Sequence, residues 1–364
     1  MNLEDLGWDD YFKTQLENHE IKNGMQPARI SQEHKGLYTL IDAEGEYLAE
    51  ISGRMRYTAV NSNDFPAVGD WVLARIYRNE DTAIIHSLLN RKNSLSRKAV
   101  SGQKSEQGKT QEQILAANID TVFLVNGLDS DFSLRRIERY MTSIYQNGMS
   151  PVIILNKTDL VNNPEDYISQ AETIAFGVPV IPVCGLNSSG IDDLKRYINP
   201  GNTIVFLGSS GVGKSTIINR LFGMERQRVN SVRESDQKGR HTTTTRELMI
   251  LPDGGIVIDT PGMREFQPWK SEEDTAGAFE DIEAIAIKCR FKNCRHESEP
   301  GCAVQEALGK GDLDSGRYKN YNRMKREARY LETRMDGNAQ MAEKKRWKSL
   351  SKRQKQFKKT SSNI

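Results

Sequence analysis

The stretch from Thr203 to Thr216 has the residues of a phosphate-binding loop. Five apolar or β-branched residues lead into the pattern G-x-x-x-x-G-K-S, and a helical pattern follows it. In this order of strand, glycine-rich loop and helix, backbone N–H groups at the helix N-terminus bind phosphate oxygens. So short a pattern also occurs by chance, and the flanking strand and helix are what favours a phosphate loop. The expected phosphate-binding residues are Gly208, Ser209, Ser210, Gly211, Val212, Gly213, Lys214, Ser215 and Thr216.

Two side chains of this loop are expected to act on the phosphates directly. Lys214 would reach the β- and γ-phosphates and take part in catalysis, and the Ser215 hydroxyl would be a ligand of Mg²⁺. The loop therefore predicts a site for a nucleoside triphosphate and its metal ion, without specifying the base.

The tetrapeptide Asn156-Lys157-Thr158-Asp159 can select that base. It follows the apolar run Pro151–Leu155, and ligands of parallel sheets bind where the strands end. The Asp159 carboxylate can accept hydrogen bonds from the ring N–H and the exocyclic amine of guanine, neither of which adenine presents. Such a site can discriminate guanine from adenine by a factor of roughly 10⁴. Asn156 would connect neighbouring loops, and Lys157 would lie along the base. Alone, this pattern is more often a solvated turn.

A third motif follows the apolar strand Gly255–Ile258. Asp259 would hold Mg²⁺ through water, and the Gly262 N–H would meet the γ-phosphate. Between the phosphate loop and this strand lies the polar stretch from Gly239 to Arg246, which leads into a strand at Leu248. Without the other motifs, this stretch would be interpreted as the start of an exposed edge strand. Because three motifs stand at three strand ends, the sequence predicts a GTPase. One of four adjacent hydroxyl residues is then expected to complete the Mg²⁺ shell: Thr242, Thr243, Thr244 or Thr245.

Three of the four cysteines and one histidine lie between residues 289 and 302. Cys289, Cys294, His296 and Cys302 offer three thiolates and one imidazole, a set that suits a closed tetrahedral zinc site. Buried cysteines acting as small hydrophobes are the alternative, but charged residues surround these ones. We therefore expect one structural Zn²⁺ per chain, in a reducing compartment, rather than disulfides.

Two kinds of element must position these motifs. From Ala28 to about Leu89, short β-rich segments alternate with turns, which predicts a small β-barrel. The OB-fold is the leading candidate, although the pattern does not separate it from an SH3-like barrel. From Thr121 onward, near-continuous apolar strands alternate with helices, which predicts a parallel sheet covered on both faces. Residues 1 to about 25 have the pattern of one amphipathic helix.

The order of the motifs along the chain is unusual. In the Ras-like arrangement the phosphate loop comes first, whereas here Asn156–Asp159 precedes Gly208, and Asp259 comes last. A sheet needs its strands adjacent in space rather than in sequence, so a permuted chain can build the same site. With the barrel before these motifs and the cysteine cluster after them, the chain beyond about residue 28 resembles the RsgA (YjeQ/YloQ-type) family of circularly permuted GTPases.

The resemblance implies a Mg²⁺-dependent GTPase that binds the small (30S) ribosomal subunit and its 16S rRNA late in subunit assembly, and leaves after hydrolysis. The sequence departs from common GTPase patterns in two places. The base-contacting loop reads Cys184-Gly185 instead of Ser-Ala, so its base contact is expected from the backbone. Met263 stands where Ras-like enzymes place a water-orienting glutamine, so intrinsic hydrolysis should be slow. It should depend on another group: His241, Mg²⁺ together with the backbone, or a partner.

Length, charge and composition are consistent with several domains. The chain has 364 residues and a net charge of +2, with an acidic beginning and a lysine-rich end. No apolar run approaches the roughly 18 residues of a membrane span, so we expect a cytoplasmic protein without membrane contact. We also expect a monomer. The expected parts are an N-terminal helical extension (1–27), the barrel (28–98), a flexible linker (99–112), the permuted GTPase domain (113–270), a helical zinc-binding domain (271–335) and a basic tail (336–364).

Two other functions remain open at this point. A nucleotide-gated RNA-binding module with negligible turnover would also fit, because Met263 cannot orient water. A zinc-containing DNA-binding regulator fits less well, because no recognition-helix spacing is present. The basic helix from Tyr318 to Met335 and the lysine-rich tail are as consistent with RNA phosphate contacts as with a solvated segment.

Overall fold

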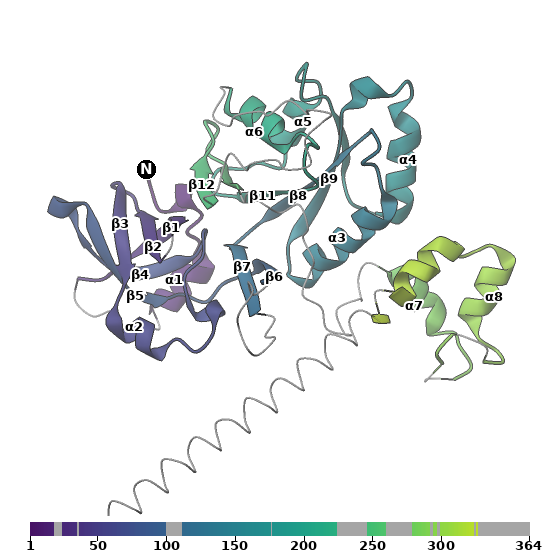
Figure 1. The fold of residues 1–364 in the computed structure, drawn as a ribbon, viewed down its shortest axis with the longest axis horizontal. Helices are drawn as coiled ribbons and strands as arrows, with labels where there is room; N and C mark the ends of the chain where they lie inside the picture. The colour runs from purple at the N-terminus through teal and green to yellow at the C-terminus, as the bar shows by residue number, and fades with distance from the viewer. Residues whose placement is uncertain are drawn as a thin grey trace, which may run out of the picture. The chain divides into compact units, whose positions relative to one another are not determined.

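A computed structural model describes most of the chain (Figure 1). The described residues are 1–17, 24–34, 36–99, 111–175, 177–223, 246–259, 279–291, 294–296, 299–323 and 325–326. They form two compact units, the first ending at Asp259 and the second beginning at Phe279.

Five strands of the first unit close into a barrel. Their order is β1-β2-β3-β5-β4, and β4 pairs back with β1. β3 and β5 are parallel, the other pairs are antiparallel, and helix α2 (Gly53–Thr58) connects β3 to β4. This is the arrangement of an OB-fold, as predicted. The strands are β1 (Gln26–His34), β2 (Leu37–Ile41), β3 (Glu46–Ile51), β4 (Trp71–Tyr77) and β5 (Thr82–Leu88), with short 3₁₀ turns at Ser62–Asp64 and Arg78–Glu80.

The N-terminal segment packs on the outside of this barrel. It contains a 3₁₀ turn, Glu4–Leu6, and helix α1, Asp10–Glu17, rather than one continuous helix. Gly7 separates them, because its φ of 85° is left-handed and ends the first turn. Leu6, Trp8 and Phe12 are buried with Trp71, and the two tryptophan rings meet edge to face with centroids 4.7 Å apart.

A two-stranded ladder, β6 (Ser94–Ala99) with β7 (Gln111–Ala117), follows the barrel. The sequence did not predict these strands. Residues 100–110, most of the predicted linker, lie outside the described residues.

The second part of the sheet carries the nucleotide motifs. The strands lie in the order β10-β9-β8-β11-β13-β12. They are parallel except for β12, so the predicted parallel sheet is in fact mixed. The connection from β12 to β13 is too short for the crossover that a parallel pair requires, and the pair forms a hairpin. The strands are β8 (Thr121–Gly127), β9 (Ser150–Asn156), β10 (Val180–Val183), β11 (Thr203–Leu207), β12 (Arg246–Ile250) and β13 (Ile256–Asp259).

Helices cover both faces of this sheet. Helices α3 (Leu134–Gln146) and α4 (Pro164–Ile174) bury their apolar residues on one face. Helices α5 (Ile191–Lys195) and α6 (Lys214–Phe222) do so on the other. Both faces of β8 are therefore buried, which explains its unbroken apolar run. A 3₁₀ turn, Thr158–Leu160, follows β9.

The barrel and the GTPase sheet are continuous, because β12 pairs with β1. A buried arginine strengthens this junction. Arg29 of β1 donates hydrogen bonds to the Leu6 and Gly69 carbonyls and, over 2.8 Å, to Thr203 Oγ1 at the start of β11. Burial lowers the pKa of Arg29 to about 10, while the Asp120 and Asp70 carboxylates act in the opposite direction.

The second unit is a small helical module. It contains α7 (Glu280–Ala286), α8 (Ala303–Lys310) and a helix over residues 315–323. Phe279, Ile282, Val304 and Tyr321 form its core. Among the described residues, no helix is long and apolar enough to cross a bilayer.

Candidate nucleotide site and metal cluster

The phosphate loop lies at the point where the strand order of the sheet reverses. β8 lies between β9 and β11, although β9 follows it and β11 comes later in the chain. Ligands of open α/β sheets bind in the crevice at such a point, beyond the carboxyl ends of the strands. The loop from Gly208 to Gly213 leaves β11 there and leads into α6.

Two glycines of this loop have no room for a side chain. Gly208 has φ 151°, and a Cβ there would lie 2.4 Å from the Val125 carbonyl oxygen of β8. Gly213 has φ 101°, and a Cβ there would lie 2.1 Å from Asn156 Nδ2. The glycines of the motif are thus required by close approach to β8 and β9 as well as by their backbone angles.

Lys214 and Ser215 occupy the first turn of α6. The Lys214 ammonium donates hydrogen bonds of 2.7 Å to the Gly208 and Ser209 carbonyls, so its side chain lies back across the loop. A lysine in this position can exchange carbonyl partners for phosphate oxygens, because its flexible stem carries three donors.

Asn156 joins three segments at the end of β9. Its amide nitrogen donates to the Val212 carbonyl of the phosphate loop over 2.8 Å, and its amide oxygen accepts from the Gly185 N–H over 3.1 Å. It therefore connects the base motif, the phosphate loop and the 184–185 loop, as the sequence predicted.

The other residues of the base motif also contact neighbouring segments. The Cys184 thiol is buried and donates to Asp159 Oδ1 over 3.2 Å. Thr158 Oγ1 donates to the Val183 carbonyl over 3.4 Å. Lys157 has a left-handed φ of 65°, and its ammonium contacts Asp129 Oδ2 at 2.6 Å.

Asp129 and Asp131, in the loop after β8, are residues that motif analysis missed. Asp131 accepts a hydrogen bond from Ser209 Oγ and pairs with Arg136 at 2.9 Å. Burial raises the pKa of Asp129, but hydrogen bonds from Lys157 and the Asp131 N–H outweigh it and place the pKa below its ordinary value. The available signal was their place directly after a buried strand at the ligand-binding edge.

The third motif is described only in part. Asp259 ends β13, whose neighbour β11 leads into the phosphate loop, so both lie at the same sheet edge. The other residues to which the sequence analysis assigned a role near the γ-phosphate or Mg²⁺ lie outside the described residues: His241, Thr242, Thr243, Thr244, Thr245, Gly262 and Met263.

Cys289, Cys294, His296 and Cys302 come together in the second unit. Their ligand atoms all lie within 4.8 Å of one another, so the group could hold a metal ion. His296 Nδ1 is 3.5 Å from the sulfurs of both Cys289 and Cys302, which are 3.9 Å apart. The Tyr318 hydroxyl donates to the His296 carbonyl over 2.6 Å and fixes that backbone. Burial, followed by the charge of Lys325, lowers the pKa of His296 and favours the neutral, metal-binding imidazole.

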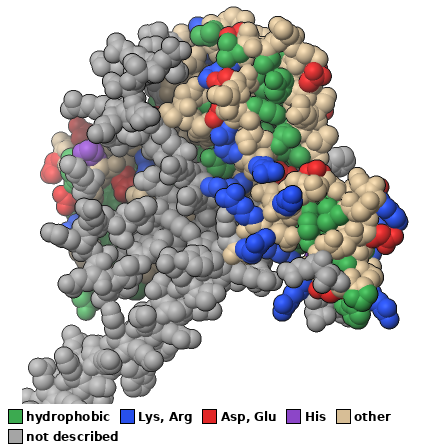
Figure 2. All heavy atoms as spheres, turned by 45° about the vertical axis from the view of Figure 1, so that its right-hand side comes forward, with side chains coloured by type: hydrophobic (Ala, Val, Ile, Leu, Met, Phe, Trp, Pro, Cys, Tyr) green, Lys and Arg blue, Asp and Glu red, His purple; other side chains and the backbone are tan. Residues whose placement is uncertain are grey.

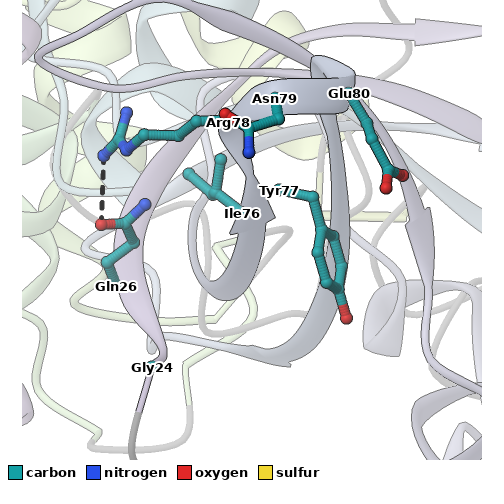
Figure 3. Close-up of a pocket in the computed structure, with 7 residues that line it drawn as sticks. All are labelled: Gly24, Gln26, Ile76, Tyr77, Arg78, Asn79 and Glu80. Atoms are coloured by element: carbon teal, nitrogen blue, oxygen red, sulfur yellow. Dashed lines mark hydrogen bonds between the residues drawn. The ribbon is translucent and has the colours of Figure 1, made fainter.

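The barrel carries a separate hollow of about 410 Å³ (Figure 3). Gly24, Gln26 and residues 76–80 line it, and Arg78 donates to Gln26 across it. Arg78 also pairs with Asp42 and Glu44 at 3.2 and 2.8 Å. None of the residues expected to bind nucleotide lines this hollow.

Comparison with known proteins identifies the family to which the chain belongs. The family model for the RsgA GTPase matches residues 88–269. The small ribosomal subunit biogenesis GTPase RsgA of Opitutus terrae is 42% identical over 360 residues, 96% of each chain. The chain belongs to the RsgA GTPase family. It is a GTP hydrolase of this family, and the predicted resemblance is confirmed.

Solved structures of similar fold support the permuted RsgA arrangement. YjeQ from Thermotoga maritima is 26% identical, with a TM-score of 0.62 covering 84% of this chain and 98% of that one. YloQ, described as a circularly permuted GTPase, shares the fold at 23% identity, with a TM-score of 0.60 covering 85% and 97%. An ABC transporter model also matches residues 191–357, a segment that includes the phosphate loop common to many nucleotide-binding families.

Proposed function

We propose that this RsgA-family GTPase acts in late assembly of the small ribosomal subunit. Its GTP form would bind the 30S particle and contact 16S rRNA, and hydrolysis to GDP and phosphate would release it. The observation that carries this proposal is the full-length likeness to the Opitutus terrae protein, named for small-subunit biogenesis.

In this proposal the nucleotide lies across the carboxyl ends of β9, β11 and β13. The phosphates meet the loop from Gly208 to Thr216, with Lys214 at the β- and γ-phosphates. Guanine meets Asn156–Asp159 and the backbone of Cys184-Gly185. This placement is supported by the hydrogen bonds of Asn156 to both loops, because they hold the base and phosphate segments at a fixed separation.

Mg²⁺ would be bound by Ser215, by Asp259 through water, and by one hydroxyl among Thr242, Thr243, Thr244 and Thr245. When bound, the ion neutralises charge on the β- and γ-phosphates. Lys214 would stabilise the same charge, and His241 is our candidate for orienting the attacking water. Gly262 would sense the γ-phosphate through its N–H.

We further propose that the cysteine cluster binds one structural Zn²⁺ per chain. A tetrahedral zinc ion with bonds of about 2.3 Å to sulfur and about 2.0 Å to nitrogen separates two sulfurs by about 3.8 Å and sulfur from nitrogen by about 3.5 Å. The distances of 3.9 Å between Cys289 and Cys302 sulfurs and 3.5 Å to His296 Nδ1 fit that geometry. With all four ligands from the protein, the ion would stabilise the fold and take no part in hydrolysis.

The zinc module offers a surface suited to RNA. Ile287 is 85% exposed and Phe291 42%, and the Arg290 guanidinium lies 5.6 Å over the Phe291 ring. Lys288 and Arg295 are exposed in the same segment. Figure 2 shows basic side chains beside apolar ones on this unit. Guanidinium and aromatic faces can stack on bases while basic groups contact phosphates.

The organisation along the chain supports a switch. We propose a barrel at 28–98, the GTPase domain at 113–270, a zinc domain at 271–335 and a basic tail at 336–364, in a monomeric cytoplasmic protein. The γ-phosphate motif directly precedes the zinc domain in sequence, so loss of the γ-phosphate could be transmitted to that domain without a long relay.

Co-sedimentation with purified 30S particles tests this proposal. The chain loaded with a non-hydrolysable GTP analogue should bind 30S more tightly than the GDP-loaded chain, and binding should weaken as salt rises. Equal binding of both forms would contradict a nucleotide-dependent switch, although the nucleotide site would stand.

A further inference from the structure

The loop between β8 and α3, residues 128–133, contacts both halves of the nucleotide site. On the base side, Asp129 accepts from the Lys157 ammonium over 2.6 Å. On the phosphate side, Asp131 accepts from the Ser209 hydroxyl. We propose that Asp129 and Asp131 are positioning residues for guanine nucleotide, which hold Lys157 and the phosphate loop in the arrangement that GTP and GDP require. This inference rests on the proposed nucleotide site and names new residues that organise it.

The loop has a fixed conformation, which a positioning role requires. The Asp131 N–H donates to Asp129 Oδ1 over 2.9 Å, and the Phe132 N–H to the Asp129 carbonyl over 3.2 Å. The Leu128 N–H donates to the Asn156 carbonyl over 2.8 Å. The Phe132 ring meets Tyr167 of α4 edge to face, with centroids 5.0 Å apart. The two carboxylates are therefore held on a turn that is tied to β9 and α4.

Each carboxylate also has a cation beside it. Asp129 contacts Lys157, and Asp131 contacts the Arg136 guanidinium at 2.9 Å. Acidic groups near a polyphosphate would otherwise repel it. Pairing removes this conflict and leaves the two aspartates as hydrogen-bond acceptors that fix their partners.

The ion pair with Asp129 restricts the side chain of Lys157. A free lysine side chain samples many rotamers and would lose this freedom on covering the base. Because Asp129 holds the ammonium, the stem of Lys157 is oriented before the nucleotide arrives, and pre-organisation of this kind increases affinity. The contact between Asp129 and Lys157 lies on the base side of the site, so its loss should lower the affinities for GTP and GDP equally.

A double-mutant cycle on the full chain tests this inference, with fluorescent GDP and GTP analogues as probes. Asp129→Ala should weaken both affinities by about tenfold, but by less than about twofold when Lys157→Ala is already present. Asp131→Ala should weaken both affinities, and most of its effect should disappear in a Ser209→Ala background. Asp193→Ala is the matched control, because it removes an exposed ion pair of 3.1 Å between Asp193 of α5 and Arg196, the residue that follows this helix. It should bind as the wild type does.

Additive effects of Asp129→Ala and Lys157→Ala, or wild-type affinity in Asp129→Ala, would overturn the inference. Asp129→Asn keeps an acceptor for the Asp131 N–H, so an intermediate affinity is expected. It also replaces Asp129→Ala in the cycle if thermal unfolding shows that the alanine variant is unfolded. The assay contains no ribosomes, so its failure leaves the ribosomal proposal intact. A wild-type chain that binds no guanine nucleotide would instead refute the nucleotide site itself.

Discussion

The nucleotide site and the metal cluster are built from the sequence in opposite ways. The cluster brings together cysteine and histidine side chains from residues 289–302, whereas the proposed nucleotide site joins segments from Asp129 to Asp259. Residues that are close in sequence can be recognised as a possible metal site from their spacing alone, because the short segment between them keeps them near one another. The nucleotide site depends on the sheet, which places the ends of β8, β9, β11 and β13 at one edge. The spacing of residues in the sequence is therefore enough to predict the metal cluster, whereas the nucleotide site depends on the topology of the sheet.

The largest expected effect is on the metal cluster. Cys294→Ser removes one of the four proposed ligands and should abolish zinc binding and the fold of the second unit, because metal binding and folding are coupled in small modules. Zinc analysis of the purified chain and proteolysis measure the two losses. Cys184→Ser is the matched control, since Cys184 lies outside the cluster and should leave the metal content unchanged. A metal-free chain with a protease-resistant second unit would show that the site is not structural.

The base motif should show a change of specificity rather than loss of the fold. In the proposed site, Asp159→Asn replaces the carboxylate that would accept the guanine N–H groups with an amide. GTP affinity should then fall by roughly 10³-fold or more because polar groups are left unpaired. Xanthosine triphosphate presents an oxygen that pairs with the amide donor, so it should bind the variant better than GTP does. Competition binding with both nucleotides measures this reversal. Unchanged GTP affinity would remove Asn156–Asp159 from the site.

The smallest effect is expected at the Cys184 thiol. A hydroxyl is a stronger donor than a thiol, so Cys184→Ser should orient Asp159 better and raise GTP affinity by about threefold. The gain should be absent in an Asp159→Asn background, which provides the control. A large loss of affinity would indicate instead that the 3.2 Å contact between Cys184 and Asp159 has another role.

Sequence reasoning located the motifs and the loop-connecting contacts of Asn156, but not the contacts made by the loop after β8. The phosphate loop, the base motif and the cysteine cluster have strong local patterns, and the barrel and sheet follow from apolar periodicity. Asp129 and Asp131 have no motif, because their importance arises only where β8 meets β9 and β11.

The remaining misses have similar physical causes. Arginine side chains are usually exposed, so the apolar periodicity of the sequence did not predict that Arg29 is buried. The β6–β7 ladder depends on pairing between segments that a polar stretch separates. A strand at Leu248 was predicted, but the antiparallel direction of β12 was not, because the apolar pattern of a buried strand does not specify its direction.

Multiple-turnover GTP hydrolysis, measured for the chain alone and with purified 30S or 50S subunits, tests the central claim most directly. The chain alone should hydrolyse GTP slowly, because Met263 cannot orient water. Completion of an active site by a partner accelerates other GTPases by about 10³–10⁵, so 30S particles should stimulate turnover strongly, whereas 50S particles should not. An unchanged rate with 30S particles, or equal stimulation by both subunits, would contradict a small-subunit assembly GTPase.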